Sequence, residues 1–248
     1  MPKPIKIFIT SWNRCLFLQE VITKIIQRTK PGSFEIIVYD NASDSETVQY
    51  LKKCLENKTV SSVIFGETNS GCNHPKNVFY SMTDEEDPLF IVTDNDIIPP
   101  ELTIDWLEQL VALMEVNPDV AVLTPQLPPV WLQGPYEKRG DLVLCTAVGN
   151  TFKICRRSAI PIQEISQFTD KYGDDGILCK LLKEKGWKVA FASNLWCFNL
   201  ERTLVDYGYT KEQLGEDPRK AGYDSDSSKH NYEPQSWLTL KPPQNLVY

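Results

Sequence analysis

The sequence predicts one large α/β domain in which helices cover both faces of a mostly parallel central sheet. In the first half of the chain, short apolar runs alternate with stretches whose apolar residues recur at helical spacing. The runs are apolar throughout rather than alternating, which is typical of parallel strands buried on both faces. The 248 residues, 42% of them hydrophobic, are enough for one such domain with a sizeable core.

The first half of the chain has four expected strands, each followed by polar residues. We place these strands at 5–9, 34–39, 62–65 and 89–92. The helices between them are expected at 18–26, 45–55 and 75–82. Pro31-Gly32 ends the first helix, and Pro75 begins the third. This order of elements predicts consecutive β-α-β units.

The second half is less regular. A helix of about a dozen residues is expected from Glu101, and another over 175–185. Strands are expected at 120–123, 142–147 and 151–155, and a proline-rich loop at 125–135 carries Trp131. From Glu201 the chain becomes polar, and we interpret 205–235 as a lid or tail rather than a domain.

The net charge and the spacing of the cysteines argue against some classes of protein and indicate a compartment. The 26 basic residues against 33 acidic ones give a net charge of −7, which argues against a nonspecific nucleic-acid binder. The seven cysteines show no C-x-x-C spacing and are interpreted as buried thiols in a reducing compartment. We see no apolar signal-peptide region and no run of membrane-spanning length. A cytoplasmic location is therefore expected, and peripheral association with a membrane stays open.

Several common catalytic motifs are absent from the sequence. There is no G-x-G-x-x-G after a strand and no G-x-x-x-x-G-K-[ST], so neither a dinucleotide fingerprint nor a P-loop is present. His74 and His230 have no neighbouring G-x-S-x-G, which argues against a serine hydrolase.

Polar residues follow each of the four expected strands. The segments are Thr10-Ser11-Trp12-Asn13-Arg14, Asp40-Asn41, Asn69-Ser70-Gly71 and Asp94-Asn95-Asp96. Because ligands of parallel sheets bind beyond the carboxyl ends of the strands, we expect these segments to converge on one site.

The triplet Asp94-Asn95-Asp96 is the strongest single signal. Two carboxylates separated by one residue in a turn can face the same hard cation, such as Mg²⁺ or Mn²⁺. The alternative is a turn or helix cap, because Asp and Asn are favoured there and Pro99-Pro100-Glu101 follows.

Two further acidic segments, with three aspartates between them, have the same kind of alternative. Asp174 and Asp175 precede an amphipathic stretch, so they serve either as a general base for a hydroxyl nucleophile or as helix-capping acids. Asp40 leaves its strand into a polar turn, where its carboxylate either binds a nucleobase or ribose or only shapes the turn.

Taken together, five motifs resemble those of the family 2 glycosyltransferases, which have the GT-A fold. The motifs are Ile9-Thr10-Ser11-Trp12-Asn13-Arg14, Glu35-Ile36-Ile37-Val38-Tyr39-Asp40-Asn41-Ala42-Ser43, Asn69-Ser70-Gly71 followed by Pro75-Lys76-Asn77, Asp94-Asn95-Asp96, and Gly173-Asp174-Asp175 followed by Leu178-Cys179. Their order and spacing agree over roughly residues 5–190. Pro75 and Lys76 stand where the family has Ala and Arg, and Asp174 stands where it prefers Glu.

The resemblance implies an inverting, nucleotide-sugar-dependent transfer, with Asp175 as the base and Asp174 beside it. The implied donor-nucleotide residues are Thr10, Ser11, Trp12, Arg14, Asp40, Asn69, Gly71, Lys76, Asp94 and Asn95. Asp94 and Asp96 would hold a divalent cation, Mn²⁺ or Mg²⁺, together with the diphosphate. Relatives often supply a late His as a further ligand; this chain has none near Asn199, so Asn199 or His230 substitutes, or Asp96 binds the cation with water.

The resulting expectation is a hexosyl- or deoxyhexosyltransferase that uses a UDP-sugar and a glycan or other hydroxyl acceptor. The GT-A domain would span 1–204, with a Rossmann-like nucleotide-binding half at 1–98, an acceptor half at 99–204, and a tail or lid at 205–248. Trp131 is a candidate for stacking on the acceptor sugar. The alternatives are a catalytically silent nucleotide- or carbohydrate-binding module and a sugar nucleotidyltransferase. The latter should carry a glycine-rich loop after its first strand, and residues 9–14 contain no glycine.

Overall fold

The computed structural model describes residues 3–102, 104–127, 130–131, 136–167, 174–200 and 239–240. The helices within these ranges are α1 (Cys15–Arg28), α2 (Ser45–Glu56), α3 (Asn73–Ser81), α4 (Trp106–Val116), α5 (Ile162–Ile165), α6 (Asp174–Glu184) and the 3-10 turn η1 (Arg157–Ala159). None of these helices is long and apolar enough to span a membrane.

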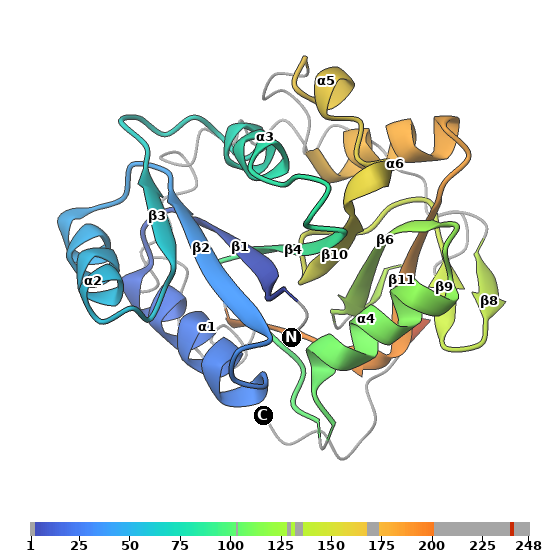
Figure 1. The fold of residues 1–248 in the computed structure, drawn as a ribbon, viewed down its shortest axis with the longest axis horizontal. Coiled ribbons are helices and arrows are strands. Elements are labelled where there is room, and N and C mark those ends of the chain that lie inside the picture. The colour runs from blue at the N-terminus through green and yellow to red at the C-terminus, as the bar shows by residue number, and fades with distance from the viewer. Residues whose placement is uncertain are drawn as a thin grey trace.

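In the described part of the chain, nine strands form one sheet in the order β3-β2-β1-β4-β10-β6-β11-β9-β8 (Figure 1). Their bounds are β1 (Ile5–Ser11), β2 (Phe34–Asp40), β3 (Ser62–Phe65), β4 (Leu89–Asp94), β6 (Val120–Gln126), β8 (Glu137–Arg139), β9 (Leu142–Leu144), β10 (Lys153–Arg156) and β11 (Lys188–Trp196). Strands β9 and β10 are antiparallel to the other seven strands of this sheet. The predicted α/β class with a mostly parallel sheet is confirmed.

Two short strand pairs lie outside this sheet. They join β5 (Ile97–Ile98) to β12 (Phe198–Asn199), and β7 (Val130–Trp131) to β13 (Thr239–Leu240). The first pair brings the chain just after Asp96 against the chain near Asn199, although the two are about a hundred residues apart in sequence.

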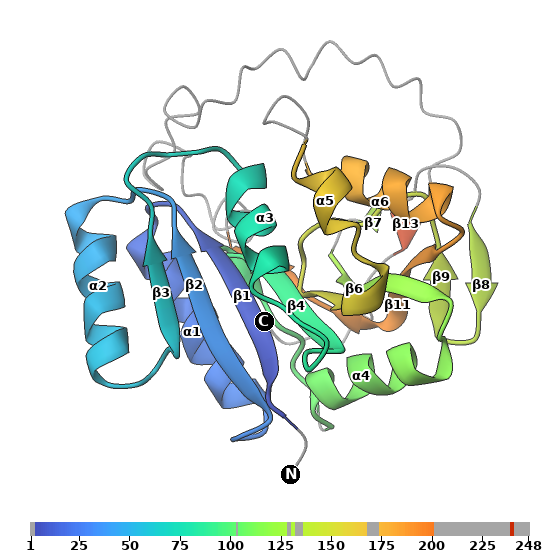
Figure 2. The same ribbon diagram turned by 45° about the horizontal axis from the view of Figure 1, so that its top comes forward.

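The apolar strands are buried on both faces because successive side chains point to opposite sides of the sheet. In β1, Ile7 and Ile9 pack with α1, α2 and α4, whereas Phe8 packs with α3, α5 and α6. Figures 1 and 2 show these two sets of helices on opposite faces of the sheet. A strand buried on both sides cannot alternate apolar with polar residues, which explains the continuous runs in the sequence.

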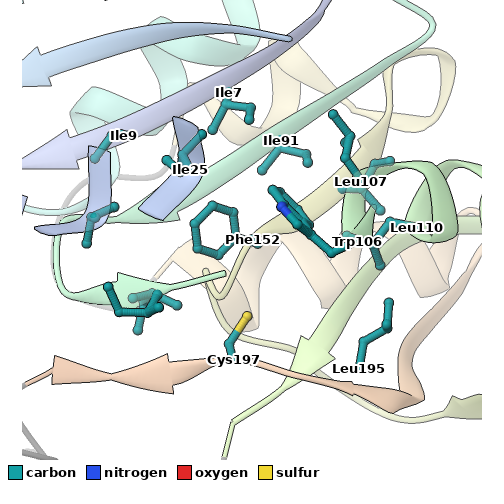
Figure 3. Packing of buried hydrophobic residues seen from close by; sticks show 14 of the residues in the cluster. Ile7, Ile9, Ile25, Ile91, Trp106, Leu107, Leu110, Phe152, Leu195 and Cys197 are labelled. Atoms are coloured by element: carbon teal, nitrogen blue, oxygen red, sulfur yellow. The ribbon is translucent and has the colours of Figure 1, made fainter. Parts of the chain in front are cut away.

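Trp106 and Phe152 pack against each other in the core cluster that contains α1, α2 and α4. Their rings meet edge to face with centroids 5.0 Å apart, and Figure 3 shows them side by side near Ile91 and Cys197. The indole N–H of Trp106 donates to the hydroxyl of Thr29 at 2.9 Å, so this fully buried ring leaves no unpaired donor. Trp106 is thus a residue of the hydrophobic core.

Some predicted boundaries are displaced. The helix expected from Glu101 begins at Trp106, because the side chain of Asp105 accepts hydrogen bonds from the amides of Leu107 and Glu108 and so caps it. The helix expected from Pro75 begins two residues earlier, and Pro75 lies in its first turn, where a missing N–H costs nothing.

The strands expected at 142–147 and 151–155 are both shorter than predicted. They cover 142–144 and 153–156, and the segment between them leaves the sheet. That segment turns inward at Phe152, whose φ of 52° is left-handed and uncommon for a bulky residue. The expected lid at 205–235 lies outside the described residues.

Candidate functional site

The polar ends of β1, β2 and β4 lie side by side at one edge of the sheet. Thr10 pairs in register with Asp94 on one side, and Ser11 pairs with Asp40 on the other. These residues were expected to converge, and the parallel pairing brings them together because all three strands end at the same level.

Asn13 connects the three loops that follow these strands. Its amide N–H donates to Oγ of Ser43 at 2.8 Å, and its Oδ1 accepts from the amide of Asp44 at 2.8 Å. Its carbonyl oxygen accepts from Nδ2 of Asn95 at 3.2 Å. Asn13 and Arg14 both have left-handed backbones, with φ of 53° and 58°, so the chain turns sharply before α1 begins at Cys15.

Asn41 fastens the loop at 69–71 to the end of β2. Its Nδ2 donates to Oδ1 of Asn69 and to the carbonyl of Gly71, both at 3.0 Å. Its Oδ1 accepts from the amide and the hydroxyl of Ser70, both at 2.9 Å. Asn69 and Gly71 were predicted as nucleotide-binding residues, and Asn41 holds them at the site.

Buried polar atoms without partners gather at the same edge. Oγ1 of Thr10, Oγ of Ser11 and Oδ1 of Asp40 are buried and make no hydrogen bond within the described ranges. Asp40 is 1% exposed, and burial raises the pKa of its carboxyl above the ordinary value of 3.8, although bonds from Ser43 oppose the shift. Since buried polar groups are normally paired, these atoms are suited to meet the polar groups of a ligand.

Asp96 lies in a small polar cluster drawn from three parts of the chain. Its Oδ2 accepts from the guanidinium of Arg14 and from Nδ2 of Asn199, each at 3.2 Å. The pairing of β5 with β12 positions Asn199, whose partner is Ile97, and the amide of Leu200 donates to the carbonyl of Asp96 at 2.8 Å. Asn199 was one of the substitutes suggested for the missing His, and it contacts Asp96 directly.

Asp94 lies beside Lys76, a buried lysine of α3. The Nζ of Lys76 is 3.9 Å from Oδ1 of Asp94, whose side chain is 43% exposed. Lys76 is 4% exposed, and its positive charge is directed at the end of β4. The ammonium of Lys76 suits the negative charge of a ligand, and the exposed carboxylate of Asp94 suits a metal ion bound together with that ligand.

The donor atoms present fit a hard divalent cation. Asp94 and Asp96 supply carboxylate oxygens and Asn199 an amide, and oxygen ligands of this kind suit Mg²⁺ and Mn²⁺. The described residues contain no cluster of three His, Cys, Asp or Glu side chains that could hold a metal. A cation at this position would therefore depend on ligand oxygens or water for the rest of its coordination, and would compete with Arg14 for Asp96.

Asp175 forms the second acidic centre of the site, at the start of α6. Its Oδ1 is 3.2 Å from Nζ of Lys153, and its side chain is 33% exposed. Lys153 pairs in register with Val92, two residues before Asp94, which places this centre on the strand next to the Asp94 centre. Through this pairing, Lys153 links Asp175 to the strand that ends at Asp94.

Four predicted residues remain to be placed: Trp12, Trp131, Asp174 and His230. Trp12 is partly exposed and makes no interaction among those resolved. The backbone of Trp131 lies in β7, but its side chain, the side chain of Asp174 and the whole of His230 lie outside the described residues.

Three residues that position the site were missing from the sequence prediction. Asn13 and Asn41 were quoted within motifs but not assigned a role, and their bonds across the loops depend on strand pairing. Lys153 had a usable signal, because it is a charged residue within the apolar run Phe152-Lys153-Ile154-Cys155. A lysine in a buried strand needs a partner, and here that partner is Asp175.

The model of the family described as glycosyl transferase family 2 matches residues 6–144, which is more than half of the chain. A comparison with curated proteins finds no match. The matched range contains the first four resembling motifs, up to and including Asp94-Asn95-Asp96.

Solved structures with the same fold include three glycosyltransferases. They are Staphylococcus aureus TarS 1–349 (17% identity, TM-score 0.57), the mannosyltransferase PcManGT from Pyrobaculum calidifontis with GDP-Man and Mn²⁺ (13%, 0.61), and GalNAc-T7 with UDP, GalNAc and Mn²⁺ (13%, 0.60). Each match covers 79% of this chain, and 60%, 56% and 43% of the other chain respectively. This chain thus matches less than two thirds of each of these proteins.

Proposed function

Because this chain belongs to glycosyl transferase family 2 and has the GT-A fold, we propose that it transfers a sugar from a nucleoside-diphosphate sugar, a UDP-sugar above all, to an acceptor hydroxyl. The transfer is of the hexosyl or deoxyhexosyl type and inverts the anomeric carbon. The observation that supports this proposal best is the adjacency of two acidic centres, one at Asp94 and Asp96 and one at Asp175, through the paired strands β4 and β10.

The nucleoside is bound at the ends of β1 and β2. Asp40 and Ser11 have buried oxygens there that lack a partner among the described residues, which suits them to accept a base N–H or to bond ribose hydroxyls. The first half of the chain, residues 1–98, supplies this donor site, and 99–204 supplies the acceptor side. Two of the similar structures contain GDP-Man or UDP, which supports a nucleotide-linked donor.

The diphosphate is bound next to Asp94 and Asp96. Lys76 and Arg14 each carry a positive charge within ion-pair distance of one of these carboxylates, so both charges lie beside the proposed position of the phosphate oxygens. Asp94, Asp96 and Asn199 would hold a divalent cation, Mn²⁺ or Mg²⁺. When bound, the cation neutralises negative charge on the departing diphosphate.

Asp175 is the general base. Its carboxylate takes the proton of the acceptor hydroxyl while the acceptor oxygen forms a bond to the anomeric carbon. The bond from that carbon to the diphosphate oxygen breaks at the same time, and its electron pair leaves with the nucleoside diphosphate. Attack from the face opposite the leaving group inverts the anomeric centre. We place this reaction in the cytoplasm, in keeping with seven free cysteines.

Two variants separate donor binding from transfer. Asp96→Ala should abolish the gain in UDP affinity that Mn²⁺ provides in calorimetric titration, and metal-independent, unaltered binding would refute the metal assignment. Asp175→Asn should bind UDP as the wild type does while transfer falls roughly 10²- to 10⁴-fold, the usual contribution of a general base. Transfer at the wild-type rate in Asp175→Asn would show that the base lies elsewhere.

A panel of nucleotide sugars, assayed for donor hydrolysis and for transfer, identifies the donor. Turnover of one donor above the others supports the proposed function. Binding of a nucleotide without turnover of any donor would instead support a catalytically silent binding module.

A further inference from the structure

Lys153 is a lysine with no access to solvent. It lies at the start of β10, in the middle of the sheet, and its side chain is 0% exposed. Lysine is almost never fully buried unless its charge is paired, because removing an ammonium from water is costly. A Met or Leu at this position would fill the same space without that cost, so core packing does not explain the lysine.

The contact that pairs this charge leads to the reacting centre. The Nζ of Lys153 lies 3.2 Å from Oδ1 of Asp175, within hydrogen-bond distance. Two other carboxylates at this edge of the sheet have cations of their own: Asp94 is near Lys76, and Asp96 is near Arg14. The Lys153 ammonium is thus directed at the carboxylate that we propose as the base.

Buried contacts hold the backbone next to Lys153. The preceding residue, Phe152, is fully buried and packs edge to face against Trp106, with its φ at 52°. The amide of Phe152 also approaches Oγ1 of Thr93 at 3.4 Å. Because Phe152 points into one core cluster, Lys153 points to the opposite face of the sheet, the face that carries α6 and Asp175.

The second oxygen of the carboxylate faces a glycine. A Cβ on Gly149 would lie 3.8 Å from Oδ2 of Asp175, with no other described atom within 4 Å outside its chain neighbours. An acceptor hydroxyl must come to about 2.6–3.2 Å from the base, so free space beside Oδ2 is needed. The backbone of Gly149 does not itself require glycine, since its φ is not positive.

We propose that Lys153 is a positioning residue for the transfer reaction, acting through Asp175. Its buried ammonium fixes Oδ1, and Oδ2, on the side of Gly149, receives the proton of the acceptor hydroxyl. The inference rests on the proposed role of Asp175 as the base. Lys153 itself touches neither donor nor acceptor.

The experiment compares Lys153→Met, Lys153→Arg and Gly149→Ala with the wild type, using the donor identified above. Lys153→Met should lower kcat roughly 10- to 100-fold, the range expected when a reacting group is displaced by about 1 Å, and leave the donor KM and UDP affinity within twofold. Its melting temperature should change little, because the desolvated ammonium is removed while the carboxylate left behind at Asp175 is 33% exposed and can be solvated by water. Lys153→Arg, which keeps the charge, should recover most of kcat.

Gly149→Ala tests the other oxygen without touching Lys153. The added methyl group should raise the acceptor KM or lower kcat several-fold while the donor KM stays unchanged. If Lys153→Met does not fold, Gly149→Ala still tests the inference.

Three outcomes would contradict the inference. These are wild-type kcat in Lys153→Met, equal loss in Lys153→Met and Lys153→Arg together with a collapsed melting temperature, or wild-type kinetics in Gly149→Ala. If the wild type transfers and Asp175→Asn does not, such an outcome removes only the role of Lys153. If the wild type turns over no donor, the proposed function itself is wrong.

Discussion

Replacing Asp40 with Asn should stabilise the protein and weaken its nucleotide binding at the same time. Asp40 is 1% exposed, and its Oδ1 has no hydrogen-bond partner among the described residues. Its carboxyl interacts with Ser43 both through the side chain and through the amide, which lies 3.3 Å from Oδ2. Burial raises the pKa of this carboxyl, which means that the folded protein tolerates the ionised form poorly. A side chain of the same shape without the charge removes that cost.

The size of both effects follows from the environment of the carboxylate. A buried polar atom left unpaired costs roughly 1–3 kcal/mol, and more when it is charged. The amide keeps the unpaired atom but loses the charge, so it should raise the free energy of unfolding by about 1 kcal/mol at pH 8. For a protein of this size that corresponds to about 2–4 °C in melting temperature. Hydrogen bonds to charged groups exceed neutral ones by about 1–1.5 kcal/mol, so UDP affinity should fall roughly 5- to 15-fold.

The stabilisation has a defined dependence on pH. Since the pKa of Asp40 is higher in the folded than in the unfolded state, folding favours the protonated form. The wild type therefore loses stability relative to Asp40→Asn as the pH rises from the unfolded value, about 3.8, through the folded pKa. Above the pKa of Asp40 in the folded state, the difference in free energy of unfolding between the wild type and Asp40→Asn is constant.

Thermal melts from pH 4 to 8, together with calorimetric titration of UDP, measure both effects. The matched control is Asp44→Asn, an exposed carboxylate nearby that caps α2 by accepting from the amide of Thr47 at 2.9 Å. Because Asn caps helices as well as Asp does, this control should change neither stability nor affinity appreciably. An Asp40→Asn protein that is less stable than the wild type at pH 8, or that binds UDP equally well, would refute the reasoning.

Two other substitutions test the surroundings of the site. Thr29→Val should lower the free energy of unfolding, measured by chemical denaturation, by about 1–3 kcal/mol, because it leaves the buried indole N–H of Trp106 without its acceptor. An unchanged free energy of unfolding would mean that the bond contributes nothing. Gly66→Ala should lower the melting temperature and the UDP affinity together. The added Cβ would lie 3.0 Å from the carbonyl oxygen of Asp40 and 3.3 Å from the ring of Tyr39, so β2 would have to shift. A melting temperature identical to that of the wild type would show that β2 can move aside freely.

The early strands could be predicted because their signal is local. The runs at 5–9 and 34–39 fall within β1 and β2, and burial of both faces leaves little choice but continuous apolar residues. Where the sheet reverses direction the signal fails. The residues expected as strand at 145–147 leave the sheet after β9, and β10 begins only at Lys153, because the left-handed Phe152 redirects the chain between them.

Helix starts followed the strength of their caps. Asp44, an N-cap with its side-chain bond in place, begins α2 where the sequence predicts it. Before α4 the proline pair at 99–100 suggested a start at Glu101, but the capping bonds come from Asp105. A sequence pattern does not distinguish which of two polar residues near a helix start will accept the amide hydrogen bonds.

The sequence by itself determined that the chain is an α/β protein with polar residues after each parallel strand, and its motifs identified the family. Those features are encoded in neighbouring residues, so they can be recognised without a fold. Only the tertiary structure decided which residues complete the site: Asn13 and Asn41 across the loops, Asn199 against Asp96, and Lys153 beneath Asp175. The physical reason is that each of these contacts joins residues between 22 and 103 positions apart, brought together by strand pairing and helix packing, and such distances leave no mark in local sequence pattern.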